Sequence, residues 1–342
     1  MQANKNLLLL FFFFAISFSG IAQSSCVQNL RDARNAYDEG KLKELPELLL
    51  GCIENGFSKE EKVEALRLVT LSYLFNEEQE KAENSYLRLL KIDPEFEANE
   101  ESDPTELLIL ADKFDTDPKF SYGVKASQNI NFIDLESSEI VLSTAMPGGY
   151  EASLNISFGL FFQYPFNNKL AMNIELHYVG RFTSLERDIV NESNEDLKQI
   201  INETQQTFEI PLLLNYKLPT RKFPLELTGG TNVHLLQSAS LTLEGAGINR
   251  NGQNILPYRN RVNMSAVLGL RSEFKIIGRN YLSAEILYQH RLRTEVKLPS
   301  QMDQLQLDMQ LQNAHREFYY RGHAVVIRVG IRFPYFKPEL IK

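Results

Sequence analysis

The sequence predicts an α+β multidomain protein, in which a small α-helical domain precedes an eight-stranded antiparallel transmembrane β-barrel. Three observations lead to this prediction. Apolar residues recur at helical spacing from residue 26 to about residue 92, and from Phe120 onward they alternate with polar residues as in β-strands. The connections between the alternating segments are long and short in turn, which is typical of barrels that cross an outer membrane.

The composition argues against several other classes of protein. The 342 residues carry a formal net charge of 36 − 44 = −8, whereas binding to nucleic acid needs a basic face. Two cysteines are too few for a structural zinc cluster, and the sequence has neither metal-ligand spacing nor a glycine-rich phosphate loop, so we expect no cofactor. After the N-terminus no run of about 18 apolar residues occurs, so no later helix is expected to span a bilayer.

Residues 1–25 have the three parts of a secretory signal peptide. Lys5 supplies the basic start, residues 7–18 form a short apolar core, and small or polar residues follow. A buried N-terminal helix is the alternative. A lipoprotein anchored through Cys26 is disfavoured, because Gln23 stands where an aliphatic residue is needed. The mature chain is therefore expected in an oxidising compartment.

The helical domain is predicted to span residues 26–94. Its four helices are expected at about residues 27–39, 43–55, 59–75 and 78–91. In the second pair, the aromatic, small and proline positions of a 34-residue helix–turn–helix unit are filled by Tyr73, Ala82, Tyr86 and Pro94. By these residues the domain resembles a tetratricopeptide repeat. Two such repeats are fewer than a freestanding solenoid needs, so the domain requires another source of stability.

A disulfide bond between Cys26 and Cys52 is a reasonable source of that stability. Cys26 opens the first predicted helix and Cys52 lies near the end of the second, and these ends meet in an antiparallel hairpin. Closing such a loop stabilises a domain by roughly 3 kcal/mol. Two separate buried thiols are the alternative, and catalytic cysteine chemistry is disfavoured because this half of the chain contains no histidine.

The acidity of the chain is concentrated in its first third. Residues 26–118 hold 11 Lys and Arg against 23 Asp and Glu, a net charge of 11 − 23 = −12. Within them, residues 95–118 are predicted to form an acidic linker with a short helix near 105–113. A charged helical face is often merely solvated, but the groove of a helical repeat also commonly binds peptides. We therefore expect a periplasmic protein partner that binds through residues 26–118.

The barrel is predicted to span residues 119–336. Its eight alternating segments lie at about residues 120–129, 152–164, 170–181, 206–217, 224–236, 262–274, 281–293 and 322–333. The connections after the second, fourth and sixth segments are about five or six residues long, and those after the first, third, fifth and seventh are roughly 20 to 30. A soluble sandwich would give no reason for this asymmetry.

The two faces of these strands differ in chemistry. One face is almost free of charge, and we expect it to contact the lipid of the outer membrane. Aromatic residues near the ends of that face, as in the girdles of membrane barrels, are Phe120, Tyr164, Tyr216, Phe274 and Phe333 at the rim of the short connections and Tyr178, Phe208 and Tyr288 at the other rim.

The opposite face carries charges of both signs and is expected to face the interior. Its charged residues are Lys125, Glu175, Glu209, Glu226, Arg271, Glu273, Glu285, Arg328 and Arg332. Because side chains fill the interior of an eight-stranded barrel, we expect Glu and Arg to pair across it. A continuous water channel is then not expected.

The segment Thr207–Tyr216, with the sequence TFEIPLLLNY, resembles the mid-barrel strand of PorT-like outer-membrane β-barrel proteins. The stretches Asp103–Leu107 and Thr116–Gly123 resemble the junction in family members that have a helical N-terminal domain. The resemblance covers roughly residues 103–336 and implies an outer-membrane protein with both ends in the periplasm. PorT itself is associated with type IX secretion and gliding, a role that a resemblance in fold does not carry over. A tail, residues 337–342, follows the terminal aromatic Phe336.

We expect no catalytic residues. An outer-membrane hydrolase would need a nucleophile and its base to converge on the lipid side near a rim. His290 and His323 have outward parity, but Ser283, on the same strand as His290, lies on the opposite face. The predicted function is therefore that of a non-enzymatic membrane anchor or assembly component, whose helical domain docks a partner of a secretion or envelope machinery. A narrow channel or transporter is the alternative.

Two long loops are further candidate binding surfaces. Residues 182–205 are acidic and rich in amides, with a helix expected around 194–202, and residues 294–320 are expected to extend the last two strands as a hairpin. Either loop is a candidate for an extracellular ligand, and mobile solvated loops are the alternative.

Overall fold

The computed structural model describes residues 20–137, 149–150, 153–190, 196–220, 223–245, 248–276, 278–297 and 319–341. The chain divides into two compact units. The helical unit contains residues 1–118 together with 336–342, and the strand unit contains residues 119–335. The predicted signal peptide lies mostly outside the described residues and stays a prediction.

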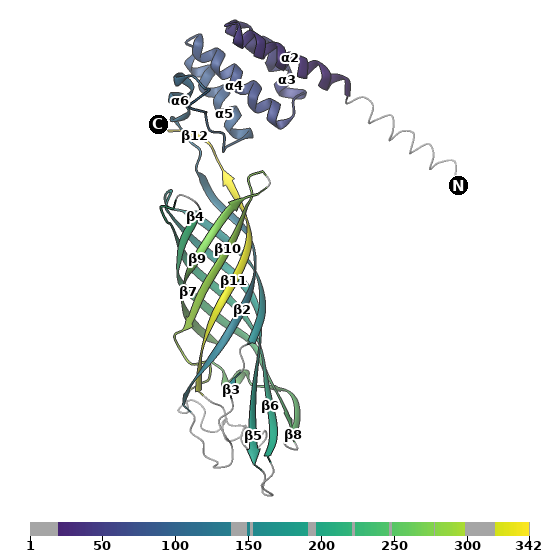
Figure 1. Ribbon diagram of the computed structural model, residues 1–342, viewed down its shortest axis with the longest axis vertical. Helices are drawn as coiled ribbons and strands as arrows, with labels where there is room; N and C mark the ends of the chain where they lie inside the picture. The colour runs from purple at the N-terminus through teal and green to yellow at the C-terminus, as the bar shows by residue number, and fades with distance from the viewer. Residues whose placement is uncertain are drawn as a thin grey trace, which may run out of the picture. The chain divides into compact units, whose positions relative to one another are not determined.

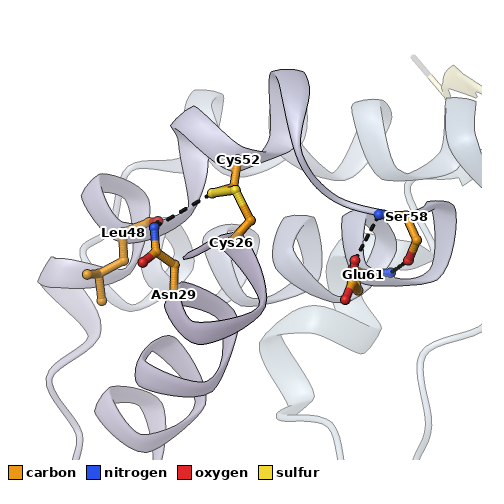
Figure 2. Close-up of a disulfide and its surroundings, with 6 residues drawn as sticks. All are labelled: Cys26, Asn29, Leu48, Cys52, Ser58 and Glu61. Atoms are coloured by element: carbon orange, nitrogen blue, oxygen red, sulfur yellow. Dashed lines mark hydrogen bonds between the residues drawn. A yellow bond between two sulfur atoms is a disulfide. The ribbon is translucent and has the colours of Figure 1, made fainter. Parts of the chain in front are cut away.

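The helical unit contains five α-helices among the described residues (Figure 1). They are α2 (Gly20–Asp38), α3 (Leu45–Asn55), α4 (Lys59–Phe75), α5 (Gln79–Ile92) and α6 (Thr105–Ala111), with a short 3-10 helix η1 (Leu42–Glu44) before α3. The predicted helices agree with these bounds within about two residues, except that the first begins at Gly20. Helix α4 starts with a capping box, in which the Ser58 hydroxyl accepts from the Glu61 amide at 3.3 Å and the Ser58 amide donates to the Glu61 carboxylate at 2.8 Å (Figure 2).

The core of the helical unit is apolar. Leucines from three different helices, Leu49, Leu66 and Leu89, are completely buried. Ala82 is also completely buried in this core. The predicted disulfide bond joins Cys26 of α2 to Cys52 of α3, whose Cα atoms are 5.6 Å apart (Figure 2). The disulfide bond therefore joins α2 to α3 within the apolar core.

Residues 95–118 contain the predicted short helix, which is α6, but they pack on the helical unit instead of forming a separate acidic linker. Leu107 and Leu110 of α6 are buried in the core of the helical unit, and the rings of Phe114 and Tyr86 lie 5.2 Å apart. An ion pair between Arg67 and Asp103 adds a polar contact. The apolar run at residues 107–111 and Phe114 explain the difference, because they supply a packing face within an otherwise acidic segment.

Most of the predicted tail, residues 337–342, pairs with the helical unit. Strand β1 (Phe114–Asp115) pairs antiparallel with strand β12 (Glu339–Leu340), and the Ile341 amide donates to the Lys113 carbonyl at 2.7 Å. The last residues of the chain are therefore part of the helical unit.

Eight long strands make up the strand unit (Figure 1). They are β2 (Pro118–Ser137), β4 (Ser153–Pro165), β5 (Leu170–Val190), β6 (Asp196–Lys217), β7 (Leu225–Gly245), β9 (Val262–Lys275), β10 (Tyr281–Arg291) and β11 (Tyr319–Phe336). Their order is β5-β4-β2-β11-β10-β9-β7-β6, and β6 also pairs with β5. Each long strand therefore has a paired neighbour on both sides.

Strands β5, β6 and β7 are longer than predicted, and this corrects the expected loop at 182–205. Instead of a loop with a helix around 194–202, β5 continues to Val190 and β6 begins at Asp196. Leu185 and Ile201 are opposite each other in the register and are both buried. They pack with Leu243 and neighbouring apolar residues in a separate apolar cluster, which favours strands over a helix here.

Shorter elements complete the end of the strand unit that carries the long connections. Strand β3 (Gly149–Tyr150) pairs with β5, and β8 (Ile248–Asn254) pairs with β7 before a 3-10 turn η2 (Leu256–Tyr258). In Figure 1, β5, β6 and β8 extend beyond the other strands at this end. The hairpin expected within 294–320 lies outside the described residues between 298 and 318.

The outer face of the strand unit is apolar and exposed. Along β4, residues such as Leu154 and Phe158 are 64% and 65% exposed, and their neighbours on the opposite face are buried. Six of the predicted girdle residues are exposed there, namely Tyr164, Tyr178, Phe208, Tyr216, Phe274 and Tyr288. The other two are partly covered by rings, since Phe120 stacks on Tyr335 at 4.7 Å and Phe333 lies 5.8 Å from Tyr122. Among the described helices, none combines the length and apolar character needed to cross a membrane.

Candidate functional site

The inner face of the long strands carries a connected network of charged side chains. Lys125 lies 2.5 Å from Glu175 and 2.7 Å from Glu285. Arg328 contacts the same two carboxylates at 2.7 and 3.5 Å. All four side chains are at most 3% exposed. The two cations and two carboxylates therefore form a closed cycle of ion pairs inside the strand unit.

The cycle extends toward the short connections. Arg271 is 3.4 Å from both Glu285 and Glu226 and also contacts Glu273, which lies 2.9 Å from Arg332. We name this group of eight residues the short-turn layer; its members are Lys125, Arg271, Arg328, Arg332, Glu175, Glu226, Glu273 and Glu285. Four cations and four carboxylates leave the layer with no net charge. It contains eight of the nine residues predicted for the interior.

A second group of ion pairs lies toward the long connections. Arg181 is 3.3 Å from Glu209, the ninth predicted residue, and 3.5 Å from Glu295, which Arg291 also contacts. Arg259 binds Glu203 through two hydrogen bonds of 2.8 and 2.6 Å. We name these six residues the long-loop layer. It too contains equal numbers of cations and carboxylates.

Sequence reasoning missed most of the long-loop layer. The predicted strands ended at residue 181 and began at residue 206, so Glu203 fell in the expected loop. Arg259 and Glu295 lie outside the predicted strands and are buried because the segments around residues 259 and 296 pair with each other. Apolar and polar residues continue to alternate after residue 181 and before residue 206. This pattern, read as two longer strands, would have placed Glu203 in the interior.

Two small cavities adjoin Arg181 and Arg291. Each has about 10 Å³ of space, and their walls include Glu209, Asn129 and Gln289 in one and His234, Thr207 and Asn260 in the other. A cavity of this size holds about one water molecule. Side chains therefore fill the interior in the part of the chain that the structure describes.

Ser265, His234 and Glu209 form a hydrogen-bonded chain across three neighbouring strands. His234 Nδ1 lies 3.1 Å from the Glu209 carboxylate, and His234 Nε2 is hydrogen-bonded to the Ser265 hydroxyl. This is the connectivity of a Ser–His–carboxylate triad. Ser265 is completely buried, however, and the adjoining cavity admits only a water molecule. The described residues enclose the Ser265 hydroxyl, so we interpret this hydrogen-bonded chain as part of the interior packing.

His290 and His323 are the two histidines that the sequence places on the outer face. The structure places Ser283 in the interior and His290 opposite His323 on the outer face, next to Tyr288. Among the described residues, no group of three or more His, Cys, Asp or Glu side chains is arranged to hold a metal ion.

The helical unit presents a different candidate surface around α6. Leu107 and Leu110 fix one side of this helix in the core and leave Ile109 58% exposed. Two exposed carboxylates lie one helical turn from this apolar residue, Glu106 three residues before it and Asp112 three residues after it. We name Glu106, Ile109 and Asp112 the acidic face. A helical surface of this kind attracts basic chains and offers one apolar contact.

Two titrating groups of the helical unit respond to their surroundings. Burial raises the pKa of Tyr86 to about 12, and the carboxylates Asp103 and Asp112 act in the same direction. A hydrogen bond from Gln79 lowers the pKa of Glu83, and Lys113, 3.2 Å away, also lowers it. Acidic residues of this unit therefore lie close enough to its core to raise the pKa of the buried Tyr86.

The comparisons with known proteins agree with the arrangement of the strands. Residues 110–293, more than half of the chain, match the family model described as outer membrane protein beta-barrel domain. No curated protein sequence matches the chain at a significant level.

Several solved structures are similar to this chain. The outer membrane protein OprG from Pseudomonas aeruginosa is 13% identical, with a TM-score of 0.30, and the match covers 64% of this chain and 96% of that one. The translocator domain of the autotransporter NalP from Neisseria meningitidis is 9% identical, with a TM-score of 0.30 and coverage of 75% and 96%. The outer membrane protein AlkL is 10% identical, with a TM-score of 0.31 and coverage of 63% and 90%.

The family match therefore gives the identity of the strand unit. The eight long strands are its transmembrane strands, and their exposed apolar face is the face that such strands present to lipid. The chain belongs to the family of outer membrane proteins with a β-barrel domain and is located in the outer membrane.

Proposed function

We propose that this protein is a non-enzymatic anchor in the outer membrane, whose helical unit docks a protein partner in the periplasm. One contrast carries the proposal. The interior of the strands is neutral and filled, with cavities of about 10 Å³, whereas the helical unit exposes the acidic face. An eight-stranded barrel of this kind fixes the chain in the membrane, and binding is left to the helical unit.

The orientation follows from the short connections. In bacterial outer-membrane barrels the short turns face the periplasm and the long loops face outward. Strand β2 begins and β11 ends at the rim of the short connections, since Ser121 is paired with Gln163 near the end of β4. Under this proposal the helical unit and the C-terminus are periplasmic. The predicted signal peptide supports the same orientation.

The chemistry of the acidic face defines the partner. Residues 26–118 have a net charge of −12, so ion pairs such as Arg34–Glu64 and Lys113–Glu83 engage only part of their acidic residues. The partner is a basic protein segment with an apolar residue that packs on Ile109. The resemblance to a tetratricopeptide repeat and to PorT-like proteins supports a partner from a secretion or envelope machinery.

Site-directed crosslinking in cells tests this docking. A photo-crosslinking residue at Ile109 is expected to capture a discrete partner, while the same residue at Phe75, which is 67% exposed on α4, is the matched control. The double variant Glu106→Lys/Asp112→Lys is expected to abolish the adduct at position 109. If position 109 gives no adduct, or if the charge reversal leaves it unchanged, the docking proposal is wrong.

A narrow channel or transporter is the second candidate, because the interior is lined by charged side chains. The two neutral layers disfavour it, since each charge already has its counter-charge within the interior. Planar-bilayer recording of the purified protein separates the two proposals. Steady single-channel currents would support the channel and contradict a filled interior.

A further inference from the structure

Strands β5, β6 and β7 carry an uncharged polar surface next to the aromatic girdle, at the end of the long connections. Leu185, Ile201 and Leu241 are buried there, so the residues that alternate with them face outward. The outward residues of β6 and β7 form three directly opposite pairs, Asn202–Thr242, Thr204–Ser240 and Gln206–Ser238. We name these six residues the neutral face. All six end in a hydroxyl or amide group, and none of them is buried.

The absence of charge from the neutral face is local. The next outward row of the same three strands contains Glu186, Ile200 and Glu244, and Lys198 forms an ion pair with Glu186. Charged residues make up 23% of the chain, so composition does not explain three successive rows without one. Hydroxyl and amide groups both donate and accept hydrogen bonds, whereas an ammonium group only donates and a carboxylate only accepts. The neutral face therefore matches a ligand whose groups also do both, such as the hydroxyl groups of a sugar.

An exposed aromatic ring on β5 lies beside the neutral face. Phe182 is opposite Thr204 in the register and is 49% exposed. It is four residues from Tyr178 of the girdle, or about 13 Å along the strand, so its ring lies on the water side of the girdle. Between these two residues, Gly180 is opposite Gln206, and a Cβ atom at Gly180 would meet no described atom within 4 Å. Gly180 therefore leaves open space between the two aromatic side chains.

The side chain of Gln206 borders this open space. Its oxygen accepts from the Ser238 hydroxyl at 3.1 Å, and its NH2 group can donate to a ligand. A sugar ring presents C–H groups on its faces and hydroxyl groups around its edge. The C–H groups pack on the negative face of an aromatic ring. A sugar stacked on Phe182 therefore brings its hydroxyl groups to Gln206 and Thr204.

We propose that the neutral face, together with Phe182 and Gly180, binds the uncharged sugar chain of a glycolipid in the membrane around the strands. Continuity with the lipid-facing surface favours a glycolipid over a free sugar, because Gln206 and the girdle residue Phe208 are successive outward residues of β6. Acyl chains that contact the strands on one side of the girdle carry their sugars to the other side. The inference shares with the proposed function the orientation of the long connections toward the outside, and it requires no protein partner.

Surface plasmon resonance with the full-length protein in detergent tests the proposal. Two probes are compared, a lipopolysaccharide with an uncharged polysaccharide chain and the same lipopolysaccharide without that chain. The wild-type protein is expected to bind the complete lipopolysaccharide at least about tenfold more tightly than the truncated one. Phe182→Ala is expected to weaken binding of the complete lipopolysaccharide about tenfold, because the aromatic contact is lost.

A second variant fills the open space without removing any contact within the protein. Gly180→Val places a favourable strand residue where its Cβ meets no described atom, so the fold should be retained and the preference for the complete lipopolysaccharide lost. The matched control is Phe166→Ala, which removes a ring that is 53% exposed in the connection between β4 and β5. This control should leave the preference unchanged. A heat-modifiable gel shift checks that all three variants are folded.

Four results would overturn the proposal. In the first, the wild-type protein binds both probes equally. In the second, folded Gly180→Val keeps the preference. In the third, Phe166→Ala weakens binding as much as Phe182→Ala, so that the effect is one of exposed aromatic area. In the fourth, the polysaccharide chain released from its lipid binds as tightly as the complete lipopolysaccharide, so that the ligand is a free sugar. None of these results affects the crosslink at Ile109, so the two proposals fail separately.

Discussion

The helical unit and the strand unit bury opposite kinds of side chain. In the helical unit, Leu66 and Leu89 are completely buried and carboxylates are exposed. In the strand unit, Arg271 and Glu175 are 1% and 2% exposed, while Leu154 is 64% exposed. The two units are built for different surroundings, water for one and lipid for the other. The overall 43% of hydrophobic residues is an average that hides this inversion.

The inversion also changes what holds each unit together. The helical unit gains stability from removing apolar area from water, at roughly 25 cal/mol per Å². The strand unit depends on hydrogen bonds between strands and on charges that must all be paired, because an unpaired buried charge is very costly. Mutations should therefore have their largest effects on opposite residue types in the two units.

The largest effect is expected from breaking the cycle of ion pairs in the short-turn layer. Glu175→Ala leaves Lys125 and Arg328 with one carboxylate, Glu285, between them. The free energy of unfolding of the strand unit should fall by about 3–5 kcal/mol. The temperature of the heat-modifiable gel shift measures this loss, and an unchanged transition would show that the cycle contributes little.

A leucine pair gives the most direct test of the inversion. Leu89→Ala, in the core of the helical unit, should cost about 2–5 kcal/mol and lower the melting temperature followed at 222 nm. Leu160→Ala, on the outer face of β4 where the side chain is 61% exposed, should change the gel-shift transition in detergent far less. Equal effects of the two substitutions would contradict the opposite roles of leucine in the two units.

Removal of the disulfide bond is expected to act on the helical unit alone. The bond closes a loop between residues 26 positions apart, so Cys26→Ser/Cys52→Ser should lower the free energy of unfolding by about 3 kcal/mol. Circular dichroism at 222 nm follows the helices, and the gel shift follows the strands in the same sample. A parallel fall in both signals would mean that the two units unfold together.

The smallest effect concerns pH and Tyr86. The folded protein keeps the phenol proton to about pH 12, above its ordinary pKa of 10.0, so the stability from this group is complete below pH 10 and is lost as the pH rises toward 12. The loss should reach about 2 kcal/mol at pH 12. Thermal melting at 222 nm between pH 9 and pH 12 measures it, and Tyr86→Phe should lack this part of the dependence.

The sequence predicted the chemistry of each face better than the lengths of the strands. Period-2 alternation identified Lys125, Glu175 and Arg328 as interior residues before any pairing was known, because parity alone determines the face of a strand. The partners of each charge depend on the register between strands far apart in sequence. No local pattern contains that register, so the division into two layers could not be predicted.

Other differences between prediction and structure arose in segments where many polar residues surround a few apolar residues that pack in a core. Residues 182–205 contain many amides and carboxylates, so the alternation of Leu185 with its polar neighbours was overlooked. The segment 95–118 looked like a linker because its acidic residues outnumber its apolar ones, yet Leu107, Leu110 and Phe114 suffice to attach it to the core. The triad-like chain of Ser265, His234 and Glu209 was missed because nucleophiles were sought on the outer face only.

The pairing of β1 with β12 has a consequence for how the protein is made. Phe114 and Leu340 are 340 − 114 = 226 positions apart, with all eight transmembrane strands between them. The ribosome therefore releases the second strand of this sheet only after all eight transmembrane strands. A chain truncated before residue 339 would leave β1 without its neighbour, so the small sheet of the helical unit forms only after the strand unit has been synthesised.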